Sequence, residues 1–262
     1  MRVDDEPAYV LESRPYRETS LLLDVLTAGH GRLAMVARGV RGSQPGQRLR
    51  RAALEPLQPL RVGFSGRGEV LSLGRIEADG LPLRPNGTAL LAALYVNELV
   101  QKLTGRGDPA PALFDLYRQW LARLDRCLAT DRPGPSRELV DGDGLAWALR
   151  RFERDLLAGL GYALALEQDA DSGEPVQADA RYVLDPEQGA RPWTANSPWP
   201  AVPGAALLAW AGEDRPGPDV LVQLRTLARV AIRHHLGGTE LRSWQLAQRW
   251  RSPPTPDSDA GD

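Results

Sequence analysis

Cysteine and histidine are scarce in this chain of 262 residues, and both absences restrict its chemistry. The only cysteine, Cys127, cannot form an internal disulfide or a zinc site built on paired cysteines. Three histidines, His30, His234 and His235, offer few ligands to a metal and few groups for acid–base catalysis. His234 and His235 fall at the end of a predicted helix, where a cation meets the helix dipole favourably. We therefore interpret them as a helix-end pair, and we expect neither a metal nor a cofactor.

Lysine is almost missing as well. The one lysine, Lys102, lies in a predicted helix, and the chain has no G-x-x-x-x-G-K-[ST] motif, which excludes the usual phosphate-binding loop of an ATPase. There is no G-x-S-x-G motif and no plausible pairing of cysteine with histidine. The acidic group Asp4-Asp5-Glu6 is interpreted as a solvated terminus. These absences indicate a protein that is not an enzyme.

Long apolar runs are also lacking. No stretch approaches the roughly 18 apolar residues that a bilayer-spanning helix needs, and the N-terminus has no apolar signal run. The apolar content of 42% is nevertheless enough for one large or two ordinary domains. We expect a soluble, cytoplasmic protein without a membrane partner.

Positive charge is concentrated in one stretch, residues 31–68, although the whole chain has a net charge of −2. This stretch holds eight arginines and one acid, Glu55, and within it residues 39–52 are expected to form a mobile loop. Because a guanidinium group keeps its charge and bonds phosphate oxygens in pairs, the stretch predicts a surface for the nucleic-acid backbone. For Arg14 and Arg17, ion pairs with Glu12 or Glu18 remain an alternative. The candidate phosphate contacts are Arg14, Arg17, Arg32, Arg38, Arg41, Arg48, Arg50, Arg51 and Arg67.

The first 80 residues favour short strands separated by turns rich in glycine. The strands are expected at 6–14, 19–27, 32–38, 59–64 and 69–77. Five strands without a long helix predict a small closed barrel, and the commonest barrel of this size is the OB-fold, which binds oligonucleotides. Its aromatic residues are Tyr9, Tyr16 and Phe64, so we expect binding to depend more on charge than on stacking, with weak sequence preference.

Helical periodicity begins near residue 88, where apolar residues recur at three- and four-residue steps. Helices are expected at 88–103, 112–129, 144–160, 205–211, 219–236 and 240–250. Gly161 stands where a glycine cap belongs, and Trp120 and Trp147 follow the apolar spacing of their helices, which predicts core packing. The predicted fold class is α+β, with an N-terminal five-stranded OB-fold barrel (1–80) followed by an α-helical domain (81–250).

Two further segments differ from these elements. Residues 166–203 are acidic and rich in proline, and we expect a small irregular insert with a short strand near 181–184. Residues 130–143 are expected to form a loop, and residues 251–262 a disordered acidic tail.

The segment Arg150-Arg151-Phe152-Glu153-Arg154 places arginines beside the apolar stripe of its helix. One interpretation is a solvated helix face. The other is a basic rim beside an apolar groove, suited to an acidic peptide that ends in a hydrophobic residue and a carboxylate.

Several stretches together resemble the RecO family of recombination mediators. They are AYVLESRPYRETSLLLDVLTAGHGRLAMVARGVRG (8–42), GRGEV (66–70), LYVNEL (94–99), LRRFERDLLAGLGY (149–162), SGEPV (172–176) and LGGTELRS (236–243). The resemblance covers nearly the whole chain and implies an OB-fold, then a helical domain with an embedded subdomain, without known catalytic residues. It also implies binding of single- and double-stranded DNA, annealing of complementary strands, and cooperation with RecR in loading RecA onto strands coated by single-stranded DNA-binding protein.

The chain departs from the family in one respect. Many members carry a four-cysteine zinc site in the region corresponding to about 155–200, and because those cysteines are missing here, zinc is not carried over. The family also binds the acidic, Phe-ending tail of single-stranded DNA-binding protein on its helical domain, through an arginine of an L-R-R-F-E element. That element is Leu149–Glu153 here, so the resemblance makes Arg150 the first candidate for the tail carboxylate and Arg151 the second.

The resulting hypothesis is a non-enzymatic recombination mediator in DNA repair, located in the cytoplasm with the nucleoid. One alternative is an adaptor that bridges RecR and single-stranded DNA-binding protein and touches DNA only incidentally. A third possibility is an RNA-binding or translation-related OB-fold protein.

Overall fold

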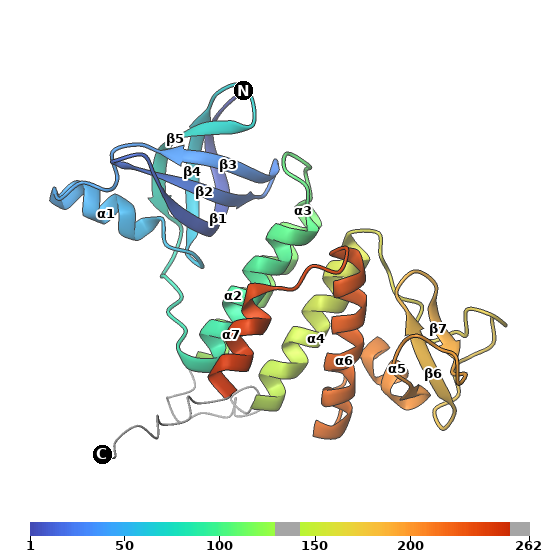
Figure 1. Ribbon diagram of the computed structural model, residues 1–262. Helices are drawn as coiled ribbons and strands as arrows, with labels where there is room; N and C mark the ends of the chain where they lie inside the picture. The colour runs from blue at the N-terminus through green and yellow to red at the C-terminus, as the bar shows by residue number, and fades with distance from the viewer. Residues whose placement is uncertain (129–141, 252–262) are drawn as a thin grey trace, which may run out of the picture.

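The computed structural model describes residues 1–128 and 142–251, and its first 78 residues form a closed barrel of five strands (Figure 1). The strands are β1 (Arg2–Tyr16), β2 (Ser20–Thr27), β3 (Gly31–Ala37), β4 (Pro59–Ser65) and β5 (Val70–Ala78). They follow the order β1-β2-β3-β5-β4, and β4 pairs back with β1. The pairs are antiparallel, apart from the parallel pair of β3 with β5. This barrel confirms the predicted five-stranded OB-fold.

Alternation along the strands builds the barrel interior, because successive side chains of a strand point to opposite faces. Ala8 and Val10 of β1 face inward, whereas Tyr9 and Leu11 belong to the core shared with the helices. Leu54, in the connection between β3 and β4, is 1% exposed and packs in the same barrel core.

The basic stretch contains a helix that the sequence analysis does not predict. Helix α1 (Pro45–Ala53) occupies most of residues 39–52, for which a mobile loop is expected, so that prediction is wrong. The helix has no buried residue and Leu49 is 75% exposed, which leaves no apolar period to recognise. Its signals are local instead. Pro45 stands at the start of the helix, and the Gln47 side chain accepts a hydrogen bond from the N-cap backbone N–H at 3.2 Å.

The rest of the described chain is mainly helical. The helices are α2 (Gly87–Leu103), α3 (Pro111–Leu128), α4 (Gly142–Gly159), α5 (Gly204–Ala211), α6 (Pro218–His235) and α7 (Arg242–Arg251). Their bounds lie within about two residues of the predicted ones, which is the usual ambiguity of helix ends. Gly161, at φ +87, follows α4, and the N–H of Tyr162 reaches the carbonyl of Leu157 at 2.8 Å, which confirms the predicted cap. Trp120 and Trp147 are buried, as predicted.

The insert is more regular than predicted. It holds a three-stranded sheet in the order β7-β6-β8, formed by β6 (Arg181–Asp185), β7 (Gly189–Pro192) and β8 (Val202–Pro203). Two of these strands, β7 and β8, are too short to be recognised from alternation. Helix α5 follows the sheet directly, and Figure 1 shows the barrel and this sheet at opposite ends of the molecule with the helices between them.

The barrel and the helices share buried contacts. Leu26 of the barrel is completely buried in the same apolar cluster as Tyr117 of α3. Asn97 of α2 is 3% exposed; its amide donates to the carbonyl of Leu11 at 2.9 Å and accepts from the Tyr117 hydroxyl at 2.7 Å. Burial raises the pKa of Tyr117, so this hydroxyl stays a donor. These contacts fix the barrel to the helices.

Two predicted segments lie mostly beyond the described part of the chain. The loop expected at 130–143 and the tail expected at 251–262 lie, apart from their ends, outside the described residues. None of the described helices is both long and apolar enough to cross a membrane.

Candidate nucleic-acid interface

The turn between β1 and β2 forms one wall of the candidate site. Arg17 opens this turn at φ +53, a left-handed conformation that residues other than glycine rarely adopt. Arg41 holds the turn in place, since its backbone N–H donates to the carbonyl of Thr19 at 2.9 Å and its guanidinium Nη1 to the carbonyl of Arg17 at 3.0 Å. The Arg17 guanidinium lies 5.2 Å from the centre of the Tyr16 ring. The wall is thus a fixed turn that presents an arginine and an aromatic ring.

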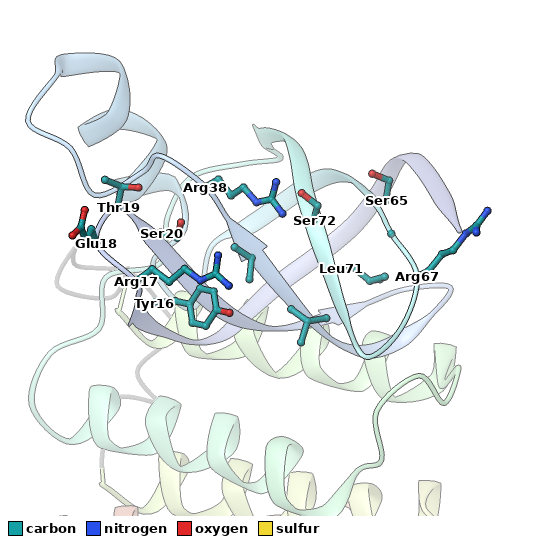
Figure 2. A pocket seen from close by; sticks show the side chains of 13 residues that line it. Tyr16, Arg17, Glu18, Thr19, Ser20, Arg38, Ser65, Arg67, Leu71 and Ser72 are labelled. Atoms are coloured by element: carbon teal, nitrogen blue, oxygen red, sulfur yellow. The ribbon is translucent and has the colours of Figure 1, made fainter.

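A cleft of about 710 Å³ separates this turn from β3, β5 and the turn between β4 and β5 (Figure 2). Val36, Val70 and Leu71 give it apolar surface, and Ser65 and Ser72 supply hydroxyl groups. Its volume lies within the roughly 300–1,000 Å³ that is typical of ligand sites. The cleft thus combines an apolar floor with polar and basic walls.

Three of the predicted arginines meet at this cleft. Arg17 comes from the β1–β2 turn, Arg38 from the end of β3 and Arg67 from the β4–β5 turn. In Figure 2, Arg17 and Arg38 point over the cleft, Arg67 projects at its other end, and Glu18 points away. All three arginines are exposed, and within the described residues none of them forms an ion pair. Their charge is available to an anion.

Five further candidates stay exposed beside the cleft. Arg14 precedes Tyr16 by two residues and so lies on the same side of β1. Helix α1 carries three arginines and lies against β5, where the Nη2 of Arg50 donates to the carbonyl of Gly74 at 3.2 Å. Helix α1 therefore adds positive charge beside β5, one of the strands that border the cleft. The five are Arg14, Arg41, Arg48, Arg50 and Arg51.

Arg32 requires a correction. Its side chain is only 11% exposed, and its Nη1 pairs with Asp24 at 2.8 Å. Its Nε and Nη2 donate to the hydroxyl and the carbonyl of Thr104, at 3.1 and 2.6 Å. Arg32 therefore joins the barrel to the end of α2, and its guanidinium has no donor directed at solvent phosphate. We therefore do not propose Arg32 as a DNA contact.

Other arginines of the barrel are balanced by acids. Arg61 pairs with both carboxylate oxygens of Asp5, at 2.7 and 2.6 Å, and holds the pKa of that carboxyl below its ordinary value. Arg75 pairs with Glu77 and lowers its pKa in the same way. The unbalanced positive charge of the barrel is thus at the cleft and α1, not spread evenly around it.

A second candidate site is a groove of about 300 Å³ among α2, α4, α6 and α7. Leu91 of α2 and Leu149 of α4 give it an apolar lining, and Trp244 of α7 adds a ring. Arg225 and Arg229 of α6 line the groove one helical turn apart, with the Arg229 guanidinium 5.0 Å from the centre of the Trp244 ring. An apolar groove with cations on one wall is suited to an acidic, apolar peptide.

Arg150 also lines this groove, but most of its side chain is buried. Its Nη2 donates to the Oε1 of Glu153 at 2.6 Å, and the hydroxyl of Tyr95 donates to the same oxygen. Burial raises the pKa of Glu153, and the neighbouring Arg150 opposes that rise. Glu153 therefore already pairs with the Arg150 guanidinium on the buried side of the groove.

The other two arginines of this segment serve the local fold. Arg151 pairs with Glu213 and does not line the groove. Arg154 donates to the last carbonyls of α5, including that of Trp210 at 2.9 Å, and so closes this helix end. The segment is neither a solvated face nor a continuous basic rim.

Sequence reasoning missed several residues of both sites. Tyr16 lies just before the turn, and Val70 is 47% exposed on a strand. Neither the exposure of Val70 nor its position in the same cleft as Tyr16 can be read from the sequence. The i, i+4 spacing of Arg225 and Arg229 was visible, but nothing local tied it to Trp244, which reaches the groove from another helix. Such pairings depend on tertiary packing.

Comparisons with known proteins agree with this architecture. A family model described as Recombination protein O N terminal matches residues 1–78, and one described as Recombination protein O C terminal matches residues 84–134. The DNA repair protein RecO of Xanthomonas euvesicatoria pv. vesicatoria is 42% identical over 252 residues, covering 95% of this chain and 98% of that protein. That of Stenotrophomonas maltophilia strain K279a is 41% identical with the same coverage. The chain belongs to the RecO family of DNA repair proteins.

Proposed function

We propose that this protein is a non-enzymatic recombination mediator that binds single- and double-stranded DNA at the barrel cleft and α1 and anneals complementary strands. The observation that carries this proposal is the cluster of exposed arginines at the cleft, which form no ion pair within the described residues, whereas Arg61 and Arg75 elsewhere on the barrel are paired with acids. Arginine in such a setting binds phosphate oxygens through paired hydrogen bonds and displaces counterions.

Annealing follows from the same surface. Neutralising phosphates on two strands at once lowers their mutual repulsion and the entropy cost of their encounter. Pairing of the bases then drives the reaction, so the protein needs no catalytic group. In this proposal the protein works with RecR to help load RecA onto strands coated by single-stranded DNA-binding protein. It acts in the cytoplasm, at the nucleoid.

The groove supports a second element of the proposal, the capture of the C-terminal tail of single-stranded DNA-binding protein. Arg150 remains the proposed contact for the tail carboxylate. Arg225 and Arg229 of α6 also line the groove and add positive charge. If the groove carried the whole function, the protein would be an adaptor between RecR and this tail. The exposed arginines of the cleft favour direct DNA binding over that alternative.

An annealing assay tests the proposal. The full chain should accelerate pairing of two complementary labelled strands at low salt, and a variant with Arg17→Gln, Arg38→Gln and Arg67→Gln should do so much more slowly. A variant with Arg61→Gln and Arg75→Gln is the matched control, because these guanidinium groups are held by Asp5 and Glu77. If the full chain neither binds nor anneals DNA at low salt, the proposal fails.

The tail groove has its own test. An acidic peptide ending in phenylalanine with a free carboxylate should bind the full chain, and the same peptide with an amidated end should bind at least about tenfold more weakly, as expected when a charged hydrogen bond is lost. Equal binding of the two peptides would contradict a carboxylate contact.

A further inference from the structure

The barrel contains three aromatic side chains, and only one of them is accessible. Tyr9 is 7% exposed and packs against the helices, and Phe64 is 2% exposed in the barrel interior. Tyr16 is partly exposed and lines the cleft. Figure 2 shows its ring beneath the Arg17 guanidinium, beside the cleft. The cleft thus offers one aromatic surface to a ligand.

The surroundings of this ring suit a flat, partly apolar group. Val36, Val70 and Leu71 contribute apolar surface to the same cleft, and Val70 is half exposed. The Arg17 guanidinium, 5.2 Å from the ring centre, is close enough for a cation–π contact. Arg38 and Arg67 supply charge farther along the cleft. A ring next to apolar side chains, with cations spaced along the walls, matches a nucleotide whose base and phosphate are bound separately.

The ring is also held in position before any ligand arrives. The left-handed Arg17 directly follows it, and Arg41 ties the turn through hydrogen bonds to the carbonyls of Thr19 and Arg17. A non-glycine residue in this conformation is uncommon, and such residues gather at ligand sites when the surroundings enforce them. Little further ordering is therefore needed at Tyr16 on binding.

We infer that Tyr16 is the position at which the cleft stacks one unpaired nucleobase, so that this residue discriminates single-stranded from double-stranded DNA. The inference rests on the proposed function. In a duplex both faces of each base are covered by neighbouring pairs, whereas a base in a single strand turns out easily onto an aromatic ring. The arginines contact phosphates, which both kinds of strand display. On binding, Arg17 exchanges its contact with the ring for the neighbouring phosphate.

This division of roles has a consequence for annealing. The contact at Tyr16 is lost when the stacked base pairs with its complement, while the phosphate contacts persist. Release of the paired product therefore costs less than release of a single strand, because one contact of the single strand has no equivalent in the duplex.

The test compares two variants of the full chain, Tyr16→Leu and Tyr16→Phe, in binding to an oligo-deoxythymidine and to a duplex of equal length. Tyr16→Leu should bind the single strand about tenfold more weakly, the effect of losing one stacked base, with unchanged duplex affinity and unchanged salt dependence. Tyr16→Phe keeps the ring and should bind like the unaltered protein. Trp193→Leu, which removes an exposed ring from the small sheet, is the control and should change neither affinity.

Each other outcome is decisive. If Tyr16→Leu binds the single strand normally, or loses both affinities equally, the stacking role is wrong and the proposed function stands. If the unaltered protein binds neither DNA at low salt, the proposed function itself fails. A measurement on the unaltered protein removes any doubt about folding. Photo-crosslinking to a strand containing 5-iodouracil should label Tyr16, and labels confined to other residues would overturn the inference.

Discussion

Arg32 lies near the start of β3 and Arg38 directly follows its end, and the two arginines differ in what surrounds their guanidinium groups. Arg32 reaches Asp24 and Thr104 at the junction with α2 and is nearly buried. Arg38 extends over the cleft and is exposed. At the level of single residues, therefore, the same side chain serves the fold at one end of the strand and the candidate DNA site at the other.

This difference predicts opposite effects of one substitution. Arg32→Gln should lower the free energy of unfolding by about 2 kcal/mol, because Asp24 and Thr104 lose charged hydrogen bonds. Its affinity for DNA should not change. Arg38→Gln should leave stability nearly unchanged and weaken DNA binding. Urea unfolding and fluorescence anisotropy of a labelled strand measure the two effects, and a loss of DNA affinity in a stably folded Arg32→Gln would contradict the assignment.

At the scale of elements, α1 behaves unlike the other helices. It buries none of its residues, so its sequence is not constrained by a core, and its three arginines extend the charge of the cleft. We therefore expect α1 to serve binding at the surface rather than packing of the core.

Charge reversal of α1 should therefore weaken DNA binding without unfolding the barrel. The variant Arg48→Glu, Arg50→Glu and Arg51→Glu should bind single- and double-stranded DNA at least about tenfold more weakly at moderate salt, since it loses phosphate contacts and gains repulsion. The matched variant with lysine at the three positions should keep most of the affinity. Unchanged binding by the glutamate variant would remove α1 from the site.

The small sheet is stabilised by hydrogen bonds of its turns. The carboxylate of Asp169 accepts from the N–H groups of Asp171 and Ser172, at 2.8 and 3.3 Å, and Asp185 accepts from those of Glu187 and Gln188. Among the described residues there is no cluster of three or more potential metal ligands of the His, Cys, Asp or Glu type. We expect the hydrogen bonds of these turns to hold the insert together.

Two measurements on the insert follow. Asp169→Ala should lower the local stability of the sheet by about 1 kcal/mol through the loss of these bonds, seen as faster hydrogen exchange of the β6 and β7 amides. Asp179→Ala, an exposed residue of the same insert, should have little effect. A chelator should leave the melting temperature unchanged. One equivalent of zinc in the purified protein, or a large drop in melting temperature with chelator, would contradict this account.

The elements also show what could be predicted from sequence. Helices with an apolar stripe, such as α4, and strands with alternation, such as β5, agree with the prediction within a residue or two. Helix α1 escaped because it buries nothing, and β8 because two residues carry no pattern. The arginines of the site were visible as a local excess of charge. That Arg32 faces inward, and that Tyr16 and Val70 share a cleft, depends on contacts between strands distant in sequence.

At the scale of the whole molecule, Asn97 of α2 contributes to the junction between the barrel and the helices. Its side chain bonds the backbone of Leu11 in the barrel and the hydroxyl of Tyr117 in α3. Its burial leaves no water to replace these bonds. Asn97→Ala should therefore lower the free energy of unfolding by about 2 kcal/mol. Asn86→Ala, where the side chain makes no capping hydrogen bond and is exposed, should cost much less. Equal stability of the two variants, measured by urea unfolding, would show that this junction contributes little.

The central claim is that guanidinium groups at the barrel cleft hold DNA phosphates, and the salt dependence of binding tests it most directly. The logarithm of affinity for a single strand is measured against the logarithm of salt concentration, for the unaltered chain and for the variant Arg17→Gln, Arg38→Gln and Arg67→Gln. Each lost phosphate contact should reduce the slope by about 0.7, so the variant should show a slope smaller by about 2 and a weaker affinity. The same slope and affinity in both proteins would contradict the claim.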